Sequence, residues 1–337
     1  MNMNKTIGFL FLLLLVQIIL AGTLLFSSPD LSAVRPDTPL IALKDRKPDR
    51  LIIEGAEGDK TVLQKEGDTW ILPEHYRFPV EKGKVDSFLA QLQGLQHGHP
   101  VATTSATLAR FRLTDEAFER RITLARGKET LETIYLGSSP GVRQIHARTA
   151  EDTTVYSVPF SAYQAPAKPE DWEDKALLSF PPEDIREIQV AGLTIQRNPS
   201  GQTGESAPRP NDPASAPPVW FAEGLAEGES LDQAGVAELV RRMAELRIAR
   251  VLGTQSKPEY GLDNPALTIR FNRKEAGSVE YRLSKPQPDT NLVLGTSHRS
   301  EYFGLHNYVG RPLMEAANRD KLVTRGKKEE KEEADSS

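Results

Sequence analysis

Apolar residues gather first in one long run near the start of the chain. Residues 7–26 carry no charge, and Gln17 and Thr23 are the polar interruptions in the run. A helix of about 20 residues spans about 30 Å, which is the thickness of a bilayer's hydrocarbon core. The run therefore predicts an N-terminal transmembrane helix, with residues 1–30 forming a membrane anchor and a short cytoplasmic tail.

A cleaved signal peptide is the alternative interpretation of this run. The apolar region of such a peptide is about 7–15 residues long, which is shorter than the run observed. Leu20-Ala21-Gly22-Thr23 resembles a lipoprotein signal, but threonine stands where an acylated cysteine would be needed. The positive charges near the two ends of the run do not choose an orientation clearly. Because a short N-terminal tail is easily left in the cytoplasm, we expect the rest of the chain to be extracytoplasmic.

Beyond a stalk over residues 31–47, apolar residues recur twice at helical spacing. Both sets follow the i, i+3, i+4, i+7 pattern of one apolar helix face. Ser230 with Gln233 suggests a capping box ahead of the second helix. The residues that define the two predicted helices are Val85, Phe88, Leu89, Leu92 and Leu95 in the first and Val236, Leu239, Val240, Met243 and Leu246 in the second.

The two predicted helices belong to an internal repeat. Ahead of them, Leu63 corresponds to Ile195 and Trp70 corresponds to Trp220, each within a strand-like pattern. The second copy is longer here because it contains an insertion, residues 199–218, rich in proline, glycine and serine. Such a composition buries too little apolar surface to offset its ordering entropy, so we expect a disordered loop.

The repeat continues after the helices as a series of short strands. The corresponding segments are Phe111-Arg112-Leu113 with Tyr260-Gly261-Leu262, Leu136-Gly137 with Leu294-Gly295, and 155–158 with 301–305. Short connections between successive strands favour antiparallel pairing, and one helix can cover one face of such a sheet.

The predicted fold class is therefore α+β. We expect an N-terminal transmembrane helix followed by two tandem, internally duplicated modules, each a mainly antiparallel sheet with one packed helix. The first module covers residues 48–180 and the second covers residues 181–325. Residues 326–337 are a mixed-charge run that is typical of a disordered tail.

Composition excludes several functions. The chain has 337 residues, a formal net charge of −5 and no cysteine. The negative charge argues against binding to nucleic acid. Without thiols, the chain has no disulfides, no thiolate nucleophile, and neither cysteine-ligated zinc nor iron–sulfur clusters.

One motif matches the pattern of a serine nucleophile. Residues 137–141 read Gly-Ser-Ser-Pro-Gly, which fits the G-x-S-x-G turn of hydrolases and would make Ser139 the nucleophile. That turn leads into a helix, but Val142, Ile145 and Ala147 do not form a helical stripe, and proline follows Ser139 directly. A hairpin loop is therefore the preferred interpretation.

Two further clusters were weighed as sites. His97 and His99 offer two imidazoles, fewer than the three or four ligands of a stable metal site. Asp171, Glu173 and Asp174 surround Trp172, and paired carboxylates can hydrolyse glycosides when they lie about 5–10 Å apart. Clustered acids on a connector are usually solvated, and we expect Trp172 to pack the joint between the modules. The sequence thus assigns no catalytic, cofactor-binding or metal-ligating residue and predicts no cofactor.

The order of these features resembles the DUF4340 family of membrane-anchored bacterial proteins. The features that carry the resemblance are an N-terminal apolar run, a tryptophan strand at Trp70, a helix over 85–95, the turn Tyr260-Gly261-Leu262-Asp263-Asn264-Pro265, strands ending in Leu-Gly, and Asp171-Trp172-Glu173-Asp174-Lys175. The first module departs from the turn motif, because it has Phe111-Arg112-Leu113 there. The resemblance covers about residues 45–320.

The resemblance implies a role beside a gliding-type ABC transporter. We therefore expect a non-enzymatic accessory or binding subunit on the extracytoplasmic side of the inner membrane. Its expected partners are the membrane and the permease and ATPase subunits of the transporter. A structural protein of envelope assembly and a cell-wall or glycan hydrolase are the alternatives. Neither a ligand nor an oligomeric state follows from the sequence.

Overall fold

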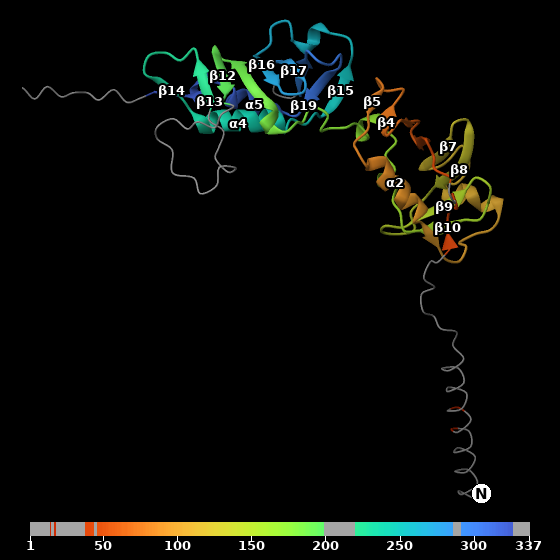
Figure 1. Ribbon diagram of the computed structural model, residues 1–337. Coiled ribbons are helices and arrows are strands. Elements are labelled where there is room, and N and C mark those ends of the chain that lie inside the picture. The colour runs from red at the N-terminus through yellow and green to blue at the C-terminus, as the bar shows by residue number, and fades with distance from the viewer. Residues whose placement is uncertain are drawn as a thin grey trace, which may run out of the picture.

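Two antiparallel sheets make up most of the structure. The computed structural model describes residues 38–43, 46–198, 220–285 and 291–325, together with Leu14 and Gln17. Each sheet has eight strands, and the two sheets form two lobes that lie side by side (Figure 1). The first lobe is coloured orange to yellow-green and the second green to blue.

The first sheet has the strand order β10-β9-β8-β7-β2-β3-β4-β5, with every neighbouring pair antiparallel. A two-residue strand β1 (Thr38–Pro39) pairs with β6 (Gln96–His97) outside this sheet. Its elements are β2 (Arg50–Gly55), β3 (Lys60–Glu66), β4 (Thr69–Leu72), β5 (Phe78–Pro79), α2 (Lys84–Gln93), α3 (Leu108–Phe111), β7 (Arg120–Arg126), β8 (Glu129–Leu136), β9 (Ile145–Thr149) and β10 (Tyr156–Val158).

The second sheet has the order β13-β12-β11-β16-β17-β18-β19-β15, again with antiparallel neighbours. Strand β14 (Glu229–Leu231) pairs with β20 (Val323–Arg325) beside it. Its other elements are β11 (Ile185–Val190), β12 (Leu193–Arg197), β13 (Trp220–Glu223), α4 (Gln233–Ala244), β15 (Arg250–Gly253), β16 (Leu267–Arg273), β17 (Gly277–Leu283), β18 (Leu292–Thr296), β19 (Tyr302–Leu305), α5 (Asn307–Ala316) and α6 (Arg319–Leu322).

The two sheets share one topology. Read from the other edge, the second sheet runs β19-β18-β17-β16-β11-β12-β13, which matches β10-β9-β8-β7-β2-β3-β4 strand for strand. The register agrees as well, because Lys65 pairs with Trp70 in the first sheet as Arg197 pairs with Trp220 in the second. The same order of elements is therefore used twice, with the first strand of each module in the middle of its sheet.

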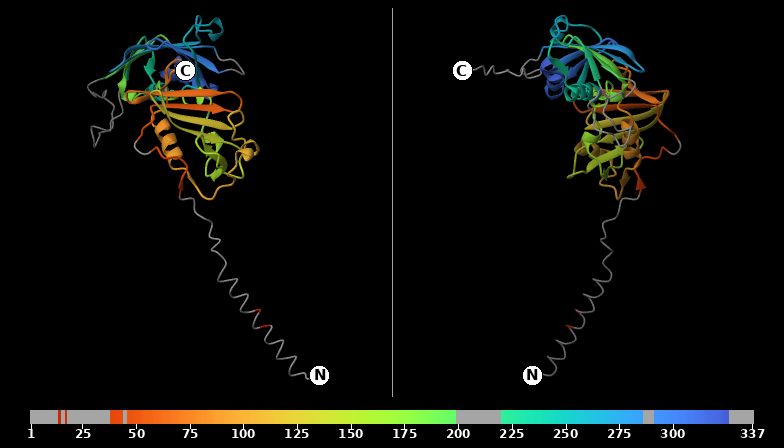
Figure 2. Two further views of the ribbon diagram at one scale, coloured as in Figure 1. Left: turned by 90° about the vertical axis from the view of Figure 1, so that its right-hand side faces the viewer. Right: turned by 60° about the vertical axis from the view of Figure 1, so that its left-hand side comes forward.

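Strand alternation and helical spacing build one continuous core. Side chains at alternate strand positions are buried, as at Leu51 and Ile53 in β2 and at Val279 and Tyr281 in β17. Helix α2 lies against the strands of the first sheet (Figure 2, left). It buries Val85, Phe88, Leu89 and Leu92, while α4 buries Val236, Leu239, Val240, Met243 and Ala244. Buried residues from both modules belong to a single apolar cluster.

A short turn packs against each sheet. The shape of this turn explains the glycine in the Tyr260-Gly261-Leu262 motif. In the first module, Leu113 packs with Leu108, Tyr135 and Val155 in a second, smaller core. The residue before Leu113 is Arg112, with a left-handed φ of 56°. Gly261 takes the corresponding place before Leu262, with a φ of 64°. The tight turn requires a residue with a positive φ at this position. Glycine adopts such a φ without strain, whereas arginine does not.

The predicted fold class needs correction. The structure is mostly antiparallel β-sheet, and the second module carries α5 and α6 in addition to the one helix expected. Within the described residues, no helix has the length and apolar character needed to cross a bilayer. The predicted transmembrane helix over 7–26 lies outside them except for Leu14 and Gln17, so it is not supported. The prediction of this helix used the length and hydropathy of one run. Strand pairing dominates the fold, and it depends on segments far apart in the chain.

Two smaller expectations change, and two others stay predictions. The insertion 199–218 and the tail 326–337 lie outside the described residues. The N-cap of α4 is Asp232 rather than Ser230, because its carboxylate accepts hydrogen bonds from the backbone N–H groups of Ala234 and Gly235. Leu136-Gly137 ends β8, whose counterpart is β17, so Ser284 rather than Gly295 takes the place of Gly137.

Replacing Gly137 with alanine is expected to destabilise the first module by about 1–3 kcal/mol, the usual cost of overpacking. A Cβ atom there would lie 2.0 Å from the backbone carbonyl oxygen of Phe111, and a backbone group cannot rotate away. Chemical denaturation measures the change. The matched control is Gly141→Ala in the same hairpin, where nothing lies within 4 Å of the new methyl group. Equal stabilities for the two variants would contradict the prediction.

Candidate functional site

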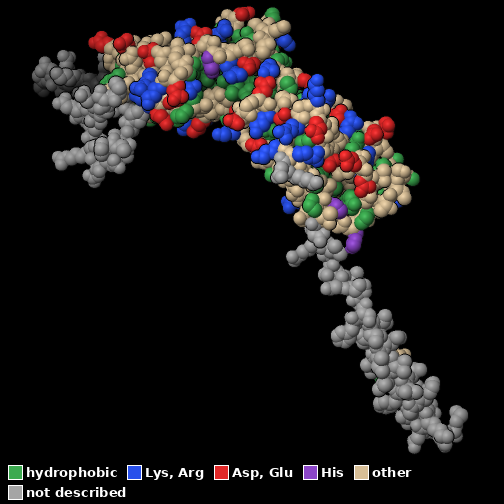
Figure 3. Space-filling view, turned by 45° about the vertical axis from the view of Figure 1, so that its right-hand side comes forward, with side chains coloured by type: hydrophobic (Ala, Val, Ile, Leu, Met, Phe, Trp, Pro, Cys, Tyr) green, Lys and Arg blue, Asp and Glu red, His purple; other side chains and the backbone are tan. Residues whose placement is uncertain are grey.

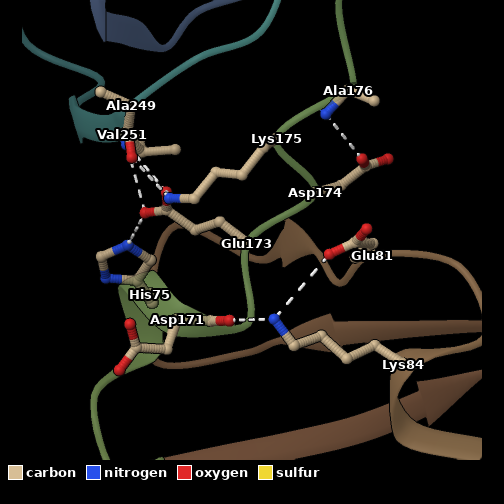
Figure 4. Close-up of polar contacts among 10 residues, drawn as sticks. All are labelled: His75, Glu81, Lys84, Asp171, Glu173, Asp174, Lys175, Ala176, Ala249 and Val251. Atoms are coloured by element: carbon tan, nitrogen blue, oxygen red, sulfur yellow. Dashed lines mark hydrogen bonds and ion pairs between the residues drawn. The ribbon is translucent and has the colours of Figure 1, made fainter. Parts of the chain in front are cut away.

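The most tightly bonded polar group lies between the two modules. The carboxylate of Glu173 is fully buried. Its Oε1 accepts hydrogen bonds from Nε2 of His75 at 2.8 Å and from the backbone N–H of Val251 at 3.1 Å (Figure 4). Its Oε2 accepts from Nζ of Lys175 at 2.6 Å and from the same N–H at 3.2 Å. We call Glu173, His75, Lys175 and Val251 the joint cluster.

The members of the joint cluster come from three parts of the chain, with Glu173 and Lys175 two residues apart in the connector. His75 lies in the turn between β4 and β5, where Tyr76 and Arg77 both adopt left-handed φ values of 56° and 52°. Glu173 follows a 3-10 turn in the connector and pairs with Val80 in an antiparallel bridge. Val251 belongs to β15 of the second sheet. The connector, the segment that leads from Trp172 into the second module, therefore carries one carboxylate. Both modules donate hydrogen bonds to it.

The chemistry of this cluster is structural. A buried carboxylate is tolerated when it is paired and hydrogen-bonded, and four short contacts satisfy this one. Lys175 also donates to the carbonyl oxygen of Ala249 at 2.6 Å, so its ammonium links the connector to the second module. With no solvent exposure, the Glu173 carboxylate has no route to a substrate. The cluster holds the two modules together.

The three neighbouring acids do not form a catalytic pair. Their side chains point in different directions (Figure 4). Asp174 accepts a hydrogen bond from the backbone N–H of Ala176 at 3.0 Å, and Asp171 is exposed. Trp172 is buried against Phe88 of α2, with ring centroids 5.4 Å apart. These contacts of Trp172 lie within the first module, whereas we expected it to pack between the modules.

Ser139 lies in a hairpin and lacks a base. Its hydroxyl donates to the carbonyl oxygens of Gly141 and Gln144, both at 2.7 Å. The neighbouring Ser138 hydroxyl lies 3.1 Å from Nδ1 of His146, but that nitrogen also lies 2.8 Å from the Ser138 carbonyl oxygen. A carbonyl can only accept, so Nδ1 carries the proton and cannot take one from Ser138. Burial lowers the pKa of His146 and keeps the ring neutral.

His97 makes an aromatic contact, whereas His99 is exposed. The ring of His97, in β6, packs against that of Tyr156 in a tilted arrangement, with centroids 3.6 Å apart. Its Nδ1 lies 2.9 Å from the carbonyl oxygen of Gly98. In the described residues, no group of three or more histidine, aspartate or glutamate side chains could hold a metal ion.

A hollow lies beside α2 in the first module. Its volume is about 830 Å³, within the range of small-molecule and peptide sites. One wall is α2 and the other is the segment before Trp172, with Tyr163 almost fully exposed at the edge. We call this hollow the α2 groove; its lining includes Asp59, Glu81, Lys82, Lys84, Ser87, Phe88, Gln91, Arg120, Tyr163, Ala167, Lys168 and Asp171.

Sequence reasoning reached part of this arrangement. It singled out Glu173 within the segment that also contains Lys175, but as a solvated acid. Nothing in the local pattern around His75 points to a residue 98 positions away. The α2 groove had no sequence signal either, since its walls come from segments that are distant in the chain.

A comparison with known families identifies the class. Two antiparallel sheets of one topology, joined at a buried carboxylate, define a duplicated β-rich protein. The model of the family described as "Domain of unknown function (DUF4340)" matches residues 70–265, more than half of the chain. The chain belongs to this family. No curated protein matches it, and no solved structure does.

Replacing Glu173 with alanine is expected to destabilise the folded protein by about 3–5 kcal/mol, because the Val251 N–H would stay buried without its acceptor and Lys175 would lose its carboxylate partner. The free energy of unfolding in urea measures this loss. The matched control is Asp174→Asn, which alters one half-buried contact in the same connector. Its expected cost is about 0.5 kcal/mol or less, because the amide oxygen of asparagine still accepts the hydrogen bond from Ala176. A Glu173→Ala protein as stable as the control would contradict the structural role.

The ring of His146 is expected to titrate below pH 6.5, the ordinary value for histidine, because burial lowers its pKa. The folded state then binds this proton less readily than the unfolded state. Its contribution to stability is present above pH 6.5 and is lost as the pH falls. An NMR titration of the ring protons measures the midpoint. A midpoint at or above 6.5 would show that Nδ1 is not held as a buried donor.

Proposed function

We propose that this protein is a non-enzymatic accessory or binding subunit of an ABC-type transporter complex, acting on the extracytoplasmic side. The observation that carries the proposal is the joint cluster. Its carboxylate, lysine and histidine, the groups that could do chemistry, are used instead to hold two modules in one body. A body of this kind presents fixed surfaces to partners.

The connector extends this support. The backbone N–H of Phe180 donates to the carbonyl oxygen of Ala244, the hydroxyl of Ser179 donates to that of Leu246, and the N–H of Ile248 donates to that of Lys175, all at 3.0 Å. The ring of Phe180 stacks on Phe271, with centroids 5.8 Å apart. The connector is thus packed along the second module rather than acting as a free linker, which suits a rigid binding body.

The face seen in Figure 3 supports binding to proteins rather than to nucleic acid. Lysine, arginine, aspartate and glutamate side chains are interspersed over the visible face (Figure 3). A nucleic-acid site would require a concentrated positive stripe. The identity of the transporter partner rests on the resemblance to the family, and the structure supports the binding role.

Purification of the tagged protein from its native host in mild detergent tests the proposal. Permease and ATPase subunits are expected to co-purify with the wild type and with Asp174→Asn. Glu173→Ala should recover several-fold less of them, because the two modules no longer hold a fixed arrangement. Repeated recovery of the wild type without transporter subunits would overturn the transporter assignment.

A further inference from the structure

The α2 groove has a counterpart in the second module. The buried residues of the two helices correspond in order, from Val85 with Val236 to Leu92 with Met243. This alignment matches the groove residues Lys84, Ser87 and Gln91 with Gly235, Glu238 and Arg242. Those three residues line a smaller hollow, about 330 Å³, whose far wall is formed by α5 and α6. The same helix face is therefore half-covered in the second module and open in the first.

The segments opposite the two helix faces also correspond. The backbone N–H of Glu81 donates to the carbonyl oxygen of Trp172 at 3.1 Å, and that of Asp232 donates to Leu322 at 2.8 Å. The bridge of Val80 with Glu173 likewise matches the pair formed by β14 and β20. Residues 159–171 thus occupy the place that residues 306–321 occupy in the second module.

The two segments differ in the element that they form. The second module has the ten-residue helix α5, followed by α6. The first module has a three-residue 3-10 turn (Ala162–Gln164) and a second one (Pro169–Asp171). A full helix is therefore missing beside α2 in the position where α5 lies near α4.

One difference between the two helices explains why the groove in the first module is wider than the hollow in the second. A Cβ atom at Gly235 would lie 1.8 Å from the carbonyl oxygen of Lys321, so α6 touches the backbone of α4. Lys84 takes that place in the first module, and its ammonium donates to the carbonyl oxygen of Asp171. The opposing segment is held away from α2 by the length of a lysine side chain, which leaves the 830 Å³ groove.

We propose that the α2 groove is a docking site for an amphipathic helix of a protein partner. The partner's helix would cover the open face of α2. In the second module, α5 and α6 of the same chain cover the corresponding face of α4. An amphipathic helix laid into a groove is a recurrent mode of peptide recognition. The partner's identity, but not the site, rests on the proposed role as a transporter subunit.

Charge indicates the chemistry of that helix. The groove lining carries the cations Lys82, Lys84, Arg120 and Lys168 against three acids, Asp59, Glu81 and Asp171. The N-terminus of α2 also faces the groove at Gly83 and has no side-chain cap, whereas Asp232 caps α4. The positive end of the helix dipole therefore adds to the positive lining. A helix with acidic residues beside its apolar stripe fits this groove.

The second module places an acid on the wall opposite α4, although its ion pairs lie within each wall: Arg242 pairs with Glu238 at 2.7 Å and Glu315 with Lys321 at 4.0 Å. Glu315 of α5 lines the smaller hollow opposite Arg242 of α4. The partner helix is thus expected to resemble α5, with small or apolar residues at its contact positions and an acid beside them. Electrostatic complementarity of this kind gives specificity and a faster association rate.

Site-specific photo-crosslinking in the native host tests the proposal. A photoreactive phenylalanine is placed at Ser87, inside the groove, or at Ala90, which is exposed on the same helix but does not line it. We expect a protein adduct from position 87 and not from position 90. Mass spectrometry of the adduct should identify a segment with apolar residues at i, i+3 or i+4, and i+7, and with flanking acids.

A blocking variant provides the second measurement. Gln91→Trp fills the groove from an exposed position and should lower co-purification of the partner identified by crosslinking about tenfold, equivalent to about 1.4 kcal/mol. Ala90→Trp is the matched control and should leave recovery unchanged. Thermal unfolding shows whether each variant is folded.

The outcomes separate this inference from the proposed function. An adduct with a helix of a protein outside any transporter would support the groove and overturn the transporter assignment. Recovery of transporter subunits without an adduct at position 87 would overturn the groove. Equal adducts at positions 87 and 90, an adduct with lipid, or a folded Gln91→Trp protein that recovers the partner normally would also overturn it.

Discussion

The arrangement of this protein depends on one buried carboxylate. Glu173 accepts hydrogen bonds from the first module through His75, from its own connector through Lys175 and from the second module through Val251. Since an unpaired charge in this position would cost several kcal/mol, the carboxylate and its donors must assemble together. The connector is therefore part of the fold of both modules, and the relative position of the sheets follows from it.

A shared topology has diverged into two different surfaces. Both modules place their first strand in the middle of an eight-stranded sheet and cover it with a helix of the same buried pattern. Gly235 allows α6 to contact α4 directly, whereas Lys84 keeps the corresponding segment at a distance. In the turn segments, Gly261 and Arg112 share a left-handed conformation that suits glycine. The second module is closed by its own helices, and the first keeps an open groove.

Sequence patterns predicted local features more successfully than remote ones. The apolar spacing from Val85 to Leu92 lies on a helix, and Trp70 and Trp220 occupy the same register in their sheets. The cap of α4 was misplaced because Gln233, assigned to a capping box, instead bonds the backbone of Trp220. Leu294-Gly295 was matched to the wrong strand because Leu-Gly pairs recur, and strand order alone distinguishes them.

The sequence by itself determined the two helices and the repeat, because apolar periodicity depends on neighbouring residues. It also excluded thiol chemistry, because its composition contains no cysteine. Tertiary structure alone decided that Glu173 is buried, that His75 is its partner and that a groove opens beside α2. Each of these depends on segments many residues apart in the chain. Burial and distance then decide whether a carboxylate is solvated or structural, and a local pattern contains neither quantity.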